Sequence, residues 1–162
     1  MPKIAIIMGS DSDFEVVKKS LKSLEIFGIE SDTRVISAHR NPDLIFEFVR
    51  SAEEEGIELF IAAAGKAAHL PGVVAGLTPL PVIGIPIQTS MMGGLDSLLS
   101  IVQMPSGVPV ATVAVNGAEN AGILAAQILS VKYPEIREKM KEYKVALNNE
   151  VIEKNKKLQL AL

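Results

Sequence analysis

The chain contains no cysteine and no tryptophan. Without cysteine it has no disulfide and no thiolate ligand for a metal, and cysteine redox chemistry is excluded. Its two tyrosines, Tyr133 and Tyr143, both lie in the C-terminal segment. Few rings are therefore available to stack on a flavin, so the sequence disfavours a flavin-binding protein.

Charge is scarce in the middle of the chain. Between positions 59 and 131 the only charged side chains, histidine set aside, are Lys66, Asp96 and Glu119. Proline, glycine and polar residues interrupt this stretch, so it supplies no membrane-spanning helix of about 20 apolar residues. Helices that are apolar on nearly every side must also be buried on the side facing away from their own sheet. We therefore expect an obligate oligomer.

A basic cluster is also missing outside the C-terminal segment, and the net charge is −3. Nucleic acid is therefore not an expected partner. The N-terminus runs into a strand-like segment at Lys3, so we expect no signal peptide and a cytoplasmic location. A length of 162 residues suits a single domain.

Apolar and amphipathic segments alternate along the chain, separated by short loops. Strands are predicted at 3–8, 33–36, 59–63, 81–86 and 110–115. Helices are predicted at 14–27, 42–56, 73–77, 95–102 and 122–132. Such alternation is typical of α/β proteins. It predicts a three-layer, flavodoxin-like doubly wound sheet of five parallel strands.

The segment from Pro134 onward predicts one long helix, because apolar side chains recur every three to four residues. They are Ile136, Met140, Tyr143, Leu147 and Val151. At about 1.5 Å per residue, this helix is about as long as a whole domain of this size. We expect residues 1–132 to form the α/β core and residues 133–162 to pack on neighbouring subunits.

The stretch Ser37–Pro42 places a histidine and an arginine between the second predicted strand and the next helix. In an open α/β sheet, the carboxyl ends of the strands border the ligand crevice. His39 can exchange a proton near neutral pH, and the guanidinium of Arg40 suits a phosphate or carboxylate. The alternative is structural: His39 caps the helix or fills a gap.

The loop Gly9–Asp13 follows the first predicted strand and contains Ser10, Ser12 and Asp13. Hydroxyls, a carboxylate and backbone N–H groups at a helix start suit the oxygens of a ribose phosphate. Ser12 with Glu15 three residues later also has the pattern of a capping box. We expect one of these side chains to be a cap and the loop as a whole to contact a ligand.

Small residues make up nearly all of the loop Ala64–Gly72, after the third predicted strand. Small side chains allow a backbone to approach a ligand closely. His69 lies within this loop. The position of His69 in this loop fits two roles equally well, a residue of the ligand pocket and a structural hydrogen-bonding residue.

Four segments in register resemble the class I N5-carboxyaminoimidazole ribonucleotide mutase family of purine biosynthesis. They are Gly9–Asp13, Ser37–Pro42, Ala68–Gly72 and Ser97–Pro105. The resemblance implies a flavodoxin-like octamer with neither a metal nor an organic cofactor. The implied reaction moves a carboxyl group of a small nucleotide substrate from an exocyclic nitrogen to ring carbon 4. Functional coupling to the ATP-dependent carboxyaminoimidazole ribonucleotide synthase is also implied.

The same resemblance implies a role for individual residues. His39 would be the general acid and base, and Arg40 would bind the phosphate. The substrate-binding residues would be Ser10, Ser12, Asp13, Ser37, Arg40, Gly65, Ala68, His69 and Leu70. The family usually has a second glycine at position 66, where this chain has Lys66. We expect Lys66 to face solvent or another subunit, because an unpaired buried lysine is costly; contact with a carboxylate is the alternative.

Two other functions compete with the mutase. A carboxylase of the same superfamily would use aminoimidazole ribonucleotide and free carbon dioxide, and only the resemblance of the segment His69–Gly72 favours the mutase over it. A non-catalytic nucleotide-binding module would need Arg40 but no histidine able to exchange protons. The placement of His39 beside Arg40 therefore favours an enzyme.

Overall fold

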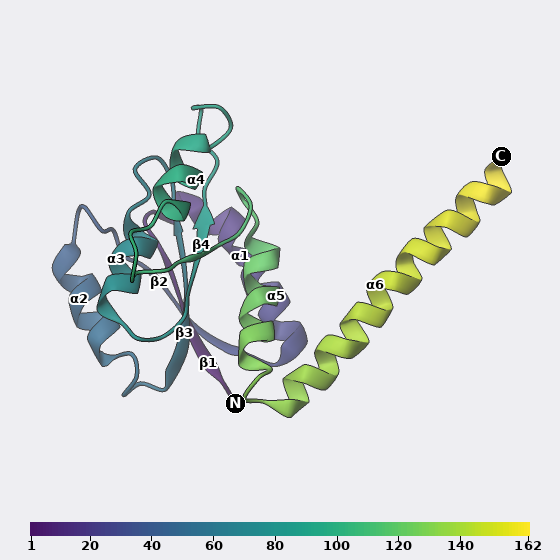
Figure 1. Cartoon of the computed structure of the whole chain (residues 1–162), viewed down its shortest axis with the longest axis horizontal. Helices are drawn as coiled ribbons and strands as arrows, with labels where there is room; N and C mark the ends of the chain where they lie inside the picture. The colour runs from purple at the N-terminus through teal and green to yellow at the C-terminus, as the bar shows by residue number, and fades with distance from the viewer.

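Five parallel strands form one sheet in the computed structural model, which describes residues 1–162 (Figure 1). In spatial order they are β2 (Glu30–Val35), β1 (Lys3–Met8), β3 (Ile57–Ala64), β4 (Val82–Pro86) and β5 (Ala111–Thr112). This order confirms the predicted flavodoxin-like doubly wound fold. Because the chain changes direction across the sheet between β1 and β3, the carboxyl ends of these strands border the crevice in which such folds bind ligands.

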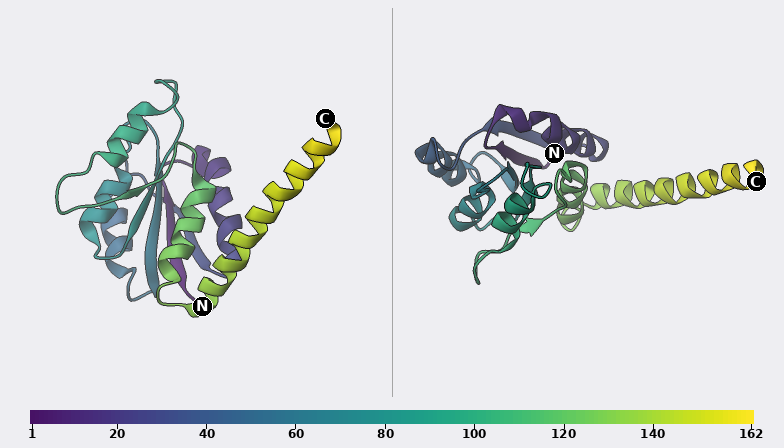
Figure 2. Two further views of the ribbon diagram at one scale, coloured as in Figure 1. Left: turned by 45° about the vertical axis from the view of Figure 1, so that its right-hand side comes forward. Right: turned by 90° about the horizontal axis from the view of Figure 1, so that it is seen from above.

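Helices cover both faces of the sheet (Figure 2). One face carries α1 (Phe14–Phe27) and α5 (Ala118–Leu129), and the other carries α2 (Pro42–Ser51), α3 (Leu70–Leu77) and α4 (Leu95–Val102). Along β1, Ile4, Ile6 and Met8 pack with the first pair of helices, whereas Ala5 and Ile7 pack with the other three. Burial on both faces is the reason why this strand is almost continuously apolar.

Some element boundaries differ from those predicted. α2 ends at Ser51, because residues 52–56 form turns that finish at Gly56 in the left-handed region, with φ 77°. α3 begins at Leu70, with Pro71 in its first turn, where proline is favourable. β5 is shorter than predicted and pairs with β4 alone, so it forms an edge of the sheet.

The last helix, α6 (Pro134–Ala161), extends away from the sheet (Figures 1 and 2). It has 28 residues, which at about 1.5 Å each give a length of about 42 Å. Ile136 and Met140 in its first turns are buried, and the ring of Tyr143 meets the ring of Phe27 edge-on. Farther along, the helix exposes Val145, Leu147, Val151, Ile152 and Leu158. The long helix is confirmed, and its contact with neighbouring subunits stays a prediction.

The outer surface of the core also exposes large apolar side chains. Leu99 and Val102 on α4, and Met91 and Met92 in the loop before it, are examples. None of the helices has both the length and the apolar composition needed to cross a bilayer. These side chains have little cover within the chain, as expected if the charge-poor helices pack against other subunits.

Candidate active site

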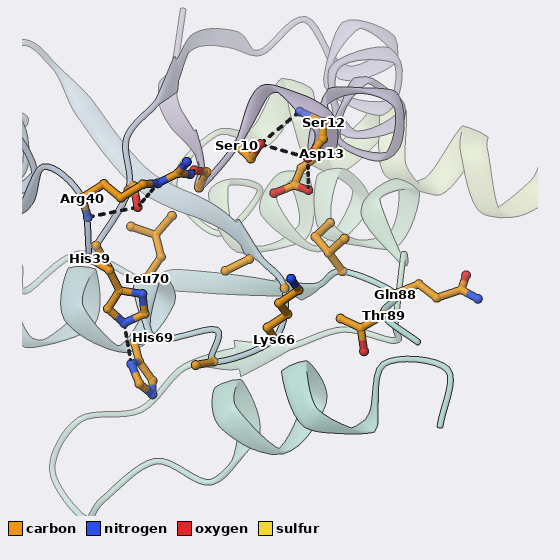
Figure 3. A pocket seen from close by; sticks show the side chains of 17 residues that line it. Ser10, Ser12, Asp13, His39, Arg40, Lys66, His69, Leu70, Gln88 and Thr89 are labelled. Atoms are coloured by element: carbon orange, nitrogen blue, oxygen red, sulfur yellow. Dashed lines mark hydrogen bonds between the residues drawn. The ribbon is translucent and has the colours of Figure 1, made fainter. Parts of the chain in front are cut away.

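A cavity of about 580 Å³ opens at the carboxyl edge of the sheet (Figure 3). The loops after β1, β2, β3 and β4 line it. The predicted site residues at its wall are Ser10, Ser12, Asp13, Ser37, His39, Arg40, Gly65, His69 and Leu70. Ala68 is the exception: its side chain is buried in the core, and Ala67 lies at the wall instead. The fold therefore brings nearly all of the predicted site into one cavity.

The Arg40 guanidinium is held in place by two neighbouring loops. Nη2 donates to the carbonyl oxygen of Gly9 at 2.6 Å, and Nε donates to the hydroxyl of Ser37 at 3.2 Å. The side chain of Asn41 accepts from the Ser37 backbone N–H at 2.7 Å and shapes the turn. Arg40 also lines a smaller hollow of about 290 Å³ beside the main cavity. An oriented guanidinium between two hollows is suited to binding an anion.

Ser10, Ser12 and Asp13 form a small hydrogen-bonded cluster after β1. The Ser10 hydroxyl accepts from the Ser12 backbone N–H at 3.3 Å, which caps the 3₁₀ turn Asp11–Asp13. The expected capping box of Ser12 and Glu15 is therefore wrong, because α1 begins at Phe14 with no side-chain cap. Ser10 is the capping residue, and the Ser12 hydroxyl bonds to Ser10 at 2.9 Å.

Burial raises the pKa of the Asp13 carboxyl above its ordinary value, although hydrogen bonds from Ser12 and Ser10 and the charge of Arg40 act in the opposite direction. This carboxyl therefore takes up a proton more readily than a free one. Because it lies at the cavity wall, this carboxyl can accept a hydrogen bond from a hydroxyl group of a ligand.

His39 and His69 meet at the cavity although they come from different loops. Nε2 of His39 lies 2.8 Å from Nδ1 of His69, and the rings cross at 83°. One of these two nitrogens must carry the proton of the hydrogen bond. Nδ1 of His39 has no partner in the chain and faces the cavity (Figure 3). The alternative in which His39 caps α2 is wrong, because Asn41 occupies the cap position.

The loop after β3 forms a tight turn at the floor of the cavity. Lys66 has φ 57°, and its carbonyl oxygen accepts from the Ala68 N–H at 2.9 Å and from the Ser100 hydroxyl at 3.4 Å. Lys66 is exposed, as expected, yet it lies at the cavity wall rather than on the outer surface. A contact between Lys66 and another subunit stays a prediction.

Gln88 and Thr89 also line the cavity, and sequence reasoning did not assign them to the site. The Gln88 backbone N–H donates to the side-chain oxygen of Asn116 at 2.9 Å, and the Thr89 hydroxyl donates to the Asp96 carboxylate at 2.6 Å. That hydrogen bond is the main reason why the pKa of Asp96 is lowered. The sequence did contain a signal for Gln88 and Thr89, because both follow a predicted strand. Loops after the carboxyl ends of parallel strands border the ligand crevice, and this holds for the loop after β4 as well as for the other three.

Comparisons with known proteins agree on one family. The family model described as AIR carboxylase matches residues 3–150. An N5-carboxyaminoimidazole ribonucleotide mutase from Thermotoga maritima is 61% identical over 98% of this chain and 93% of its own. A chloroplastic phosphoribosylaminoimidazole carboxylase from Vigna aconitifolia is 51% identical over 96% of this chain and 28% of its own. The crystal structure of Treponema denticola PurE matches with a TM-score of 0.88 at 33% identity, covering 98% of this chain and 99% of that one.

Proposed function

The chain belongs to the AIR carboxylase family, and on that premise we propose how its cavity carries out the N5-carboxyaminoimidazole ribonucleotide mutase reaction. Several relatives are named as this mutase, and the mutase reaction is an isomerisation in purine biosynthesis. The carboxyl group moves from the exocyclic nitrogen to ring carbon 4, which gives 5-amino-1-(5-phosphoribosyl)imidazole-4-carboxylate. The observation that carries the proposed mechanism is the histidine pair beside Arg40 in one cavity.

The phosphate end of the substrate is assigned to Arg40, Ser10 and Ser37. The hydrogen bonds from Arg40 to Gly9 and Ser37 orient the guanidinium before any ligand arrives, and this lowers the entropy lost on binding. Ser12 and Asp13, which lie beside Ser10 at the cavity wall, are assigned to the ribose hydroxyls. This orientation places the imidazole ring toward the histidines.

His39 is the proposed general acid and base, acting through Nδ1. It first protonates the exocyclic nitrogen of the carbamate, and the N–C bond breaks with its electron pair passing to nitrogen. Ring carbon 4 then attacks the released carbon dioxide, and His39 removes the carbon-4 proton to restore the aromatic ring. One proton is given and one is taken, so His39 ends in its starting state.

His69 orients and supports His39 in this scheme. Once His39 has given its proton, its Nε2–H donates to Nδ1 of His69, which leaves Nδ1 of His39 bare and facing the substrate. The hydrogen bond made by one ring nitrogen sets the role of the other. A pure binding module has no need of this arrangement, so the histidine pair supports catalysis.

Carbon dioxide must stay in the cavity between the two steps. Gly65, Ala67 and Leu70 form an apolar part of the wall next to His69, and the buried Ala68 supports it from the core. Close packing of small groups around the ring would keep carbon dioxide near carbon 4 and keep water away. This wall is the feature that supports an internal transfer over uptake from solution.

We expect carboxyl carbon to be retained during turnover. When substrate with a labelled carboxyl group reacts in unlabelled bicarbonate, most label should appear in the product, at a rate independent of bicarbonate. The measurement is the isotope content of the product by mass spectrometry. Since the Vigna aconitifolia relative is named as a carboxylase, extensive loss of label with a rate that rises with bicarbonate would instead favour that reaction.

We further propose that the protein assembles into an octamer through α6 and the exposed faces of the core. The support is the set of exposed apolar side chains on α6, together with Leu99 and Val102 on α4. Isolated apolar side chains on a surface are ordinary, but a projecting helix that exposes several of them has little reason to be stable alone.

Sedimentation at micromolar concentration should therefore show one large species and no folded monomer. Val151→Glu should weaken the assembly by placing a charge in an apolar contact, whereas Asn148→Glu, a change at a polar position of the same helix, is the control. A stable, folded monomer of the unmodified chain would contradict the proposal.

The substrate's chemistry also limits where it is supplied. A carbamate on an aromatic amine loses carbon dioxide readily, so the ATP-dependent synthase that forms it should be functionally coupled to this enzyme. The phosphate ester does not cross a bilayer, and we propose a cytoplasmic location for both steps.

A further inference from the structure

Lys66 occupies a backbone conformation that disfavours its residue type. It is one of three non-glycine residues with positive φ, at 57°, together with Met92 and Asn116. Asparagine tolerates this region through local hydrogen bonding, whereas a lysine side chain gains nothing there. Hydrogen bonds from the Ala68 N–H and the Ser100 hydroxyl to the Lys66 carbonyl oxygen hold the turn in place. A residue kept in an unfavourable conformation beside a cavity is a candidate for a functional role.

The Lys66 side chain extends from this turn into the cavity. Figure 3 shows it between the histidine pair and the loop with Gln88 and Thr89. None of the ion pairs in the chain includes Lys66. The nearby Asp96 carboxylate accepts hydrogen bonds at Oδ1 from the Thr89 hydroxyl at 2.6 Å and from the Ser97 N–H at 2.8 Å, and it forms no ion pair with Lys66. The ammonium group is therefore available to a ligand.

The cavity holds two permanent cations at separate places. Arg40 lies on the loop after β2 and is tied to Gly9, while Lys66 lies on the loop after β3. Under the proposed function, the substrate carries two anionic groups, a phosphate and a carboxylate, at opposite ends. Arg40 accounts for the phosphate. Lys66 is the only other lysine or arginine at the cavity wall, and a second anion at the imidazole end would lie near it.

We propose that Lys66 binds the migrating carboxyl group, as the carbamate in the substrate and as the ring carboxylate in the product. This inference rests on the proposed function and adds a residue that sets the preference for carboxylated ligands. Lys66 is a binding residue for the reacting group, and it takes no part in the proton transfers assigned to His39. A flexible ammonium can follow the carboxylate from nitrogen to carbon, because its three donors rotate freely on a four-carbon chain.

The test compares ligands that differ only in the carboxylate. Calorimetry would give the affinities for 5-aminoimidazole ribonucleotide and for its 4-carboxylated product in the unmodified chain, Lys66→Met and Lys66→Arg. For Lys66→Met we expect the preference for the carboxylated ligand to fall about tenfold, as for loss of one charged hydrogen-bond partner. Affinity for the uncarboxylated ligand should not change. Lys66→Arg should keep most of the preference.

Lys66→Gly separates backbone strain from ligand binding. Glycine accepts positive φ at no steric cost, so this variant should raise the Tm by about 2–4 °C. It should lose the preference for the carboxylated ligand to the same extent as Lys66→Met. A glycine variant that kept the preference would overturn the assignment to the side chain.

The remaining outcomes separate this inference from the proposed function. If Lys66→Met keeps both mutase turnover and the ligand preference, Lys66 has no role at the carboxylate and the function stands. A smaller sedimentation coefficient with an unchanged preference would identify a subunit contact and also overturn the inference. If the unmodified chain binds neither ligand, the proposed function and the inference fall together.

Discussion

His39→Asn is expected to lower kcat by about 10²–10⁴-fold, because it removes the group that both gives and takes a proton. Asparagine places an amide near the position of Nδ1, the atom that faces the cavity (Figure 3). It can still form a hydrogen bond there, but it cannot exchange a proton. Substrate affinity should therefore stay near that of the unmodified chain. Single-turnover rates and calorimetric affinity measure the two effects separately.

His69→Ala is the comparison for this result, because alanine leaves no hydrogen-bonding group at the position of Nδ1 of His69. It removes the partner of His39 at 2.8 Å but leaves Nδ1 of His39 in the cavity. We expect a smaller loss of kcat than in His39→Asn, since His39 keeps its proton-exchanging ring and loses only the group that orients it. If His39→Asn retained near-normal turnover, the acid–base assignment would be refuted. A large increase in the substrate Kd with unchanged kcat would point instead to a binding role.

Arg40→Ala is expected to weaken binding of the ribonucleotide by about 2 kcal/mol, as for loss of a charged hydrogen-bond partner. The guanidinium already holds a fixed direction through Gly9 and Ser37, so little freedom is lost when the phosphate binds. The dephosphorylated riboside lacks this contact, and its affinity should change little. The measured quantity is the ratio of the two affinities in each variant.

Arg50→Ala is the control for charge alone. Arg50 lies in the last turn of α2, away from the cavity, with its guanidinium carbon 5.7 Å from the centre of the Phe46 ring. Arg50→Ala removes the same charge from a position outside the cavity, so the ribotide-to-riboside ratio should stay unchanged. An unchanged ratio in Arg40→Ala as well would exclude phosphate binding by Arg40.

Local patterns were enough to predict the strands and the edge of the sheet that carries the site. Residues 4–8 are apolar at every position because β1 is buried on both faces. Parallel strands have their carboxyl ends at one edge, so the loops containing Ser10, His39 and His69 were expected there. The charge-poor middle of the chain likewise predicted apolar outer faces on the helices, and Leu99 and Val102 show them.

The partners of the side chains within the site were decided by the tertiary structure. His39 and His69 are 30 residues apart in the chain, and neither loop alone predicts that a nitrogen of one ring lies 2.8 Å from a nitrogen of the other. The choice of Ser10 as the cap, and of Ala67 instead of Ala68 at the wall, also depended on the torsions of short loops. In such loops a shift of one position changes which side chain points into a cavity.

Regular elements and loops differ in how side-chain direction is set. In a helix or strand the direction repeats with a fixed period, so the buried face can be read from the order of residues. A loop has no such period, and its torsions are imposed by the strands and helices that pack around it. The sequence by itself therefore determined which chemical groups lie at this edge of the sheet. Only the tertiary structure decided that the paired histidines and Lys66, in its unfavourable conformation, share one cavity.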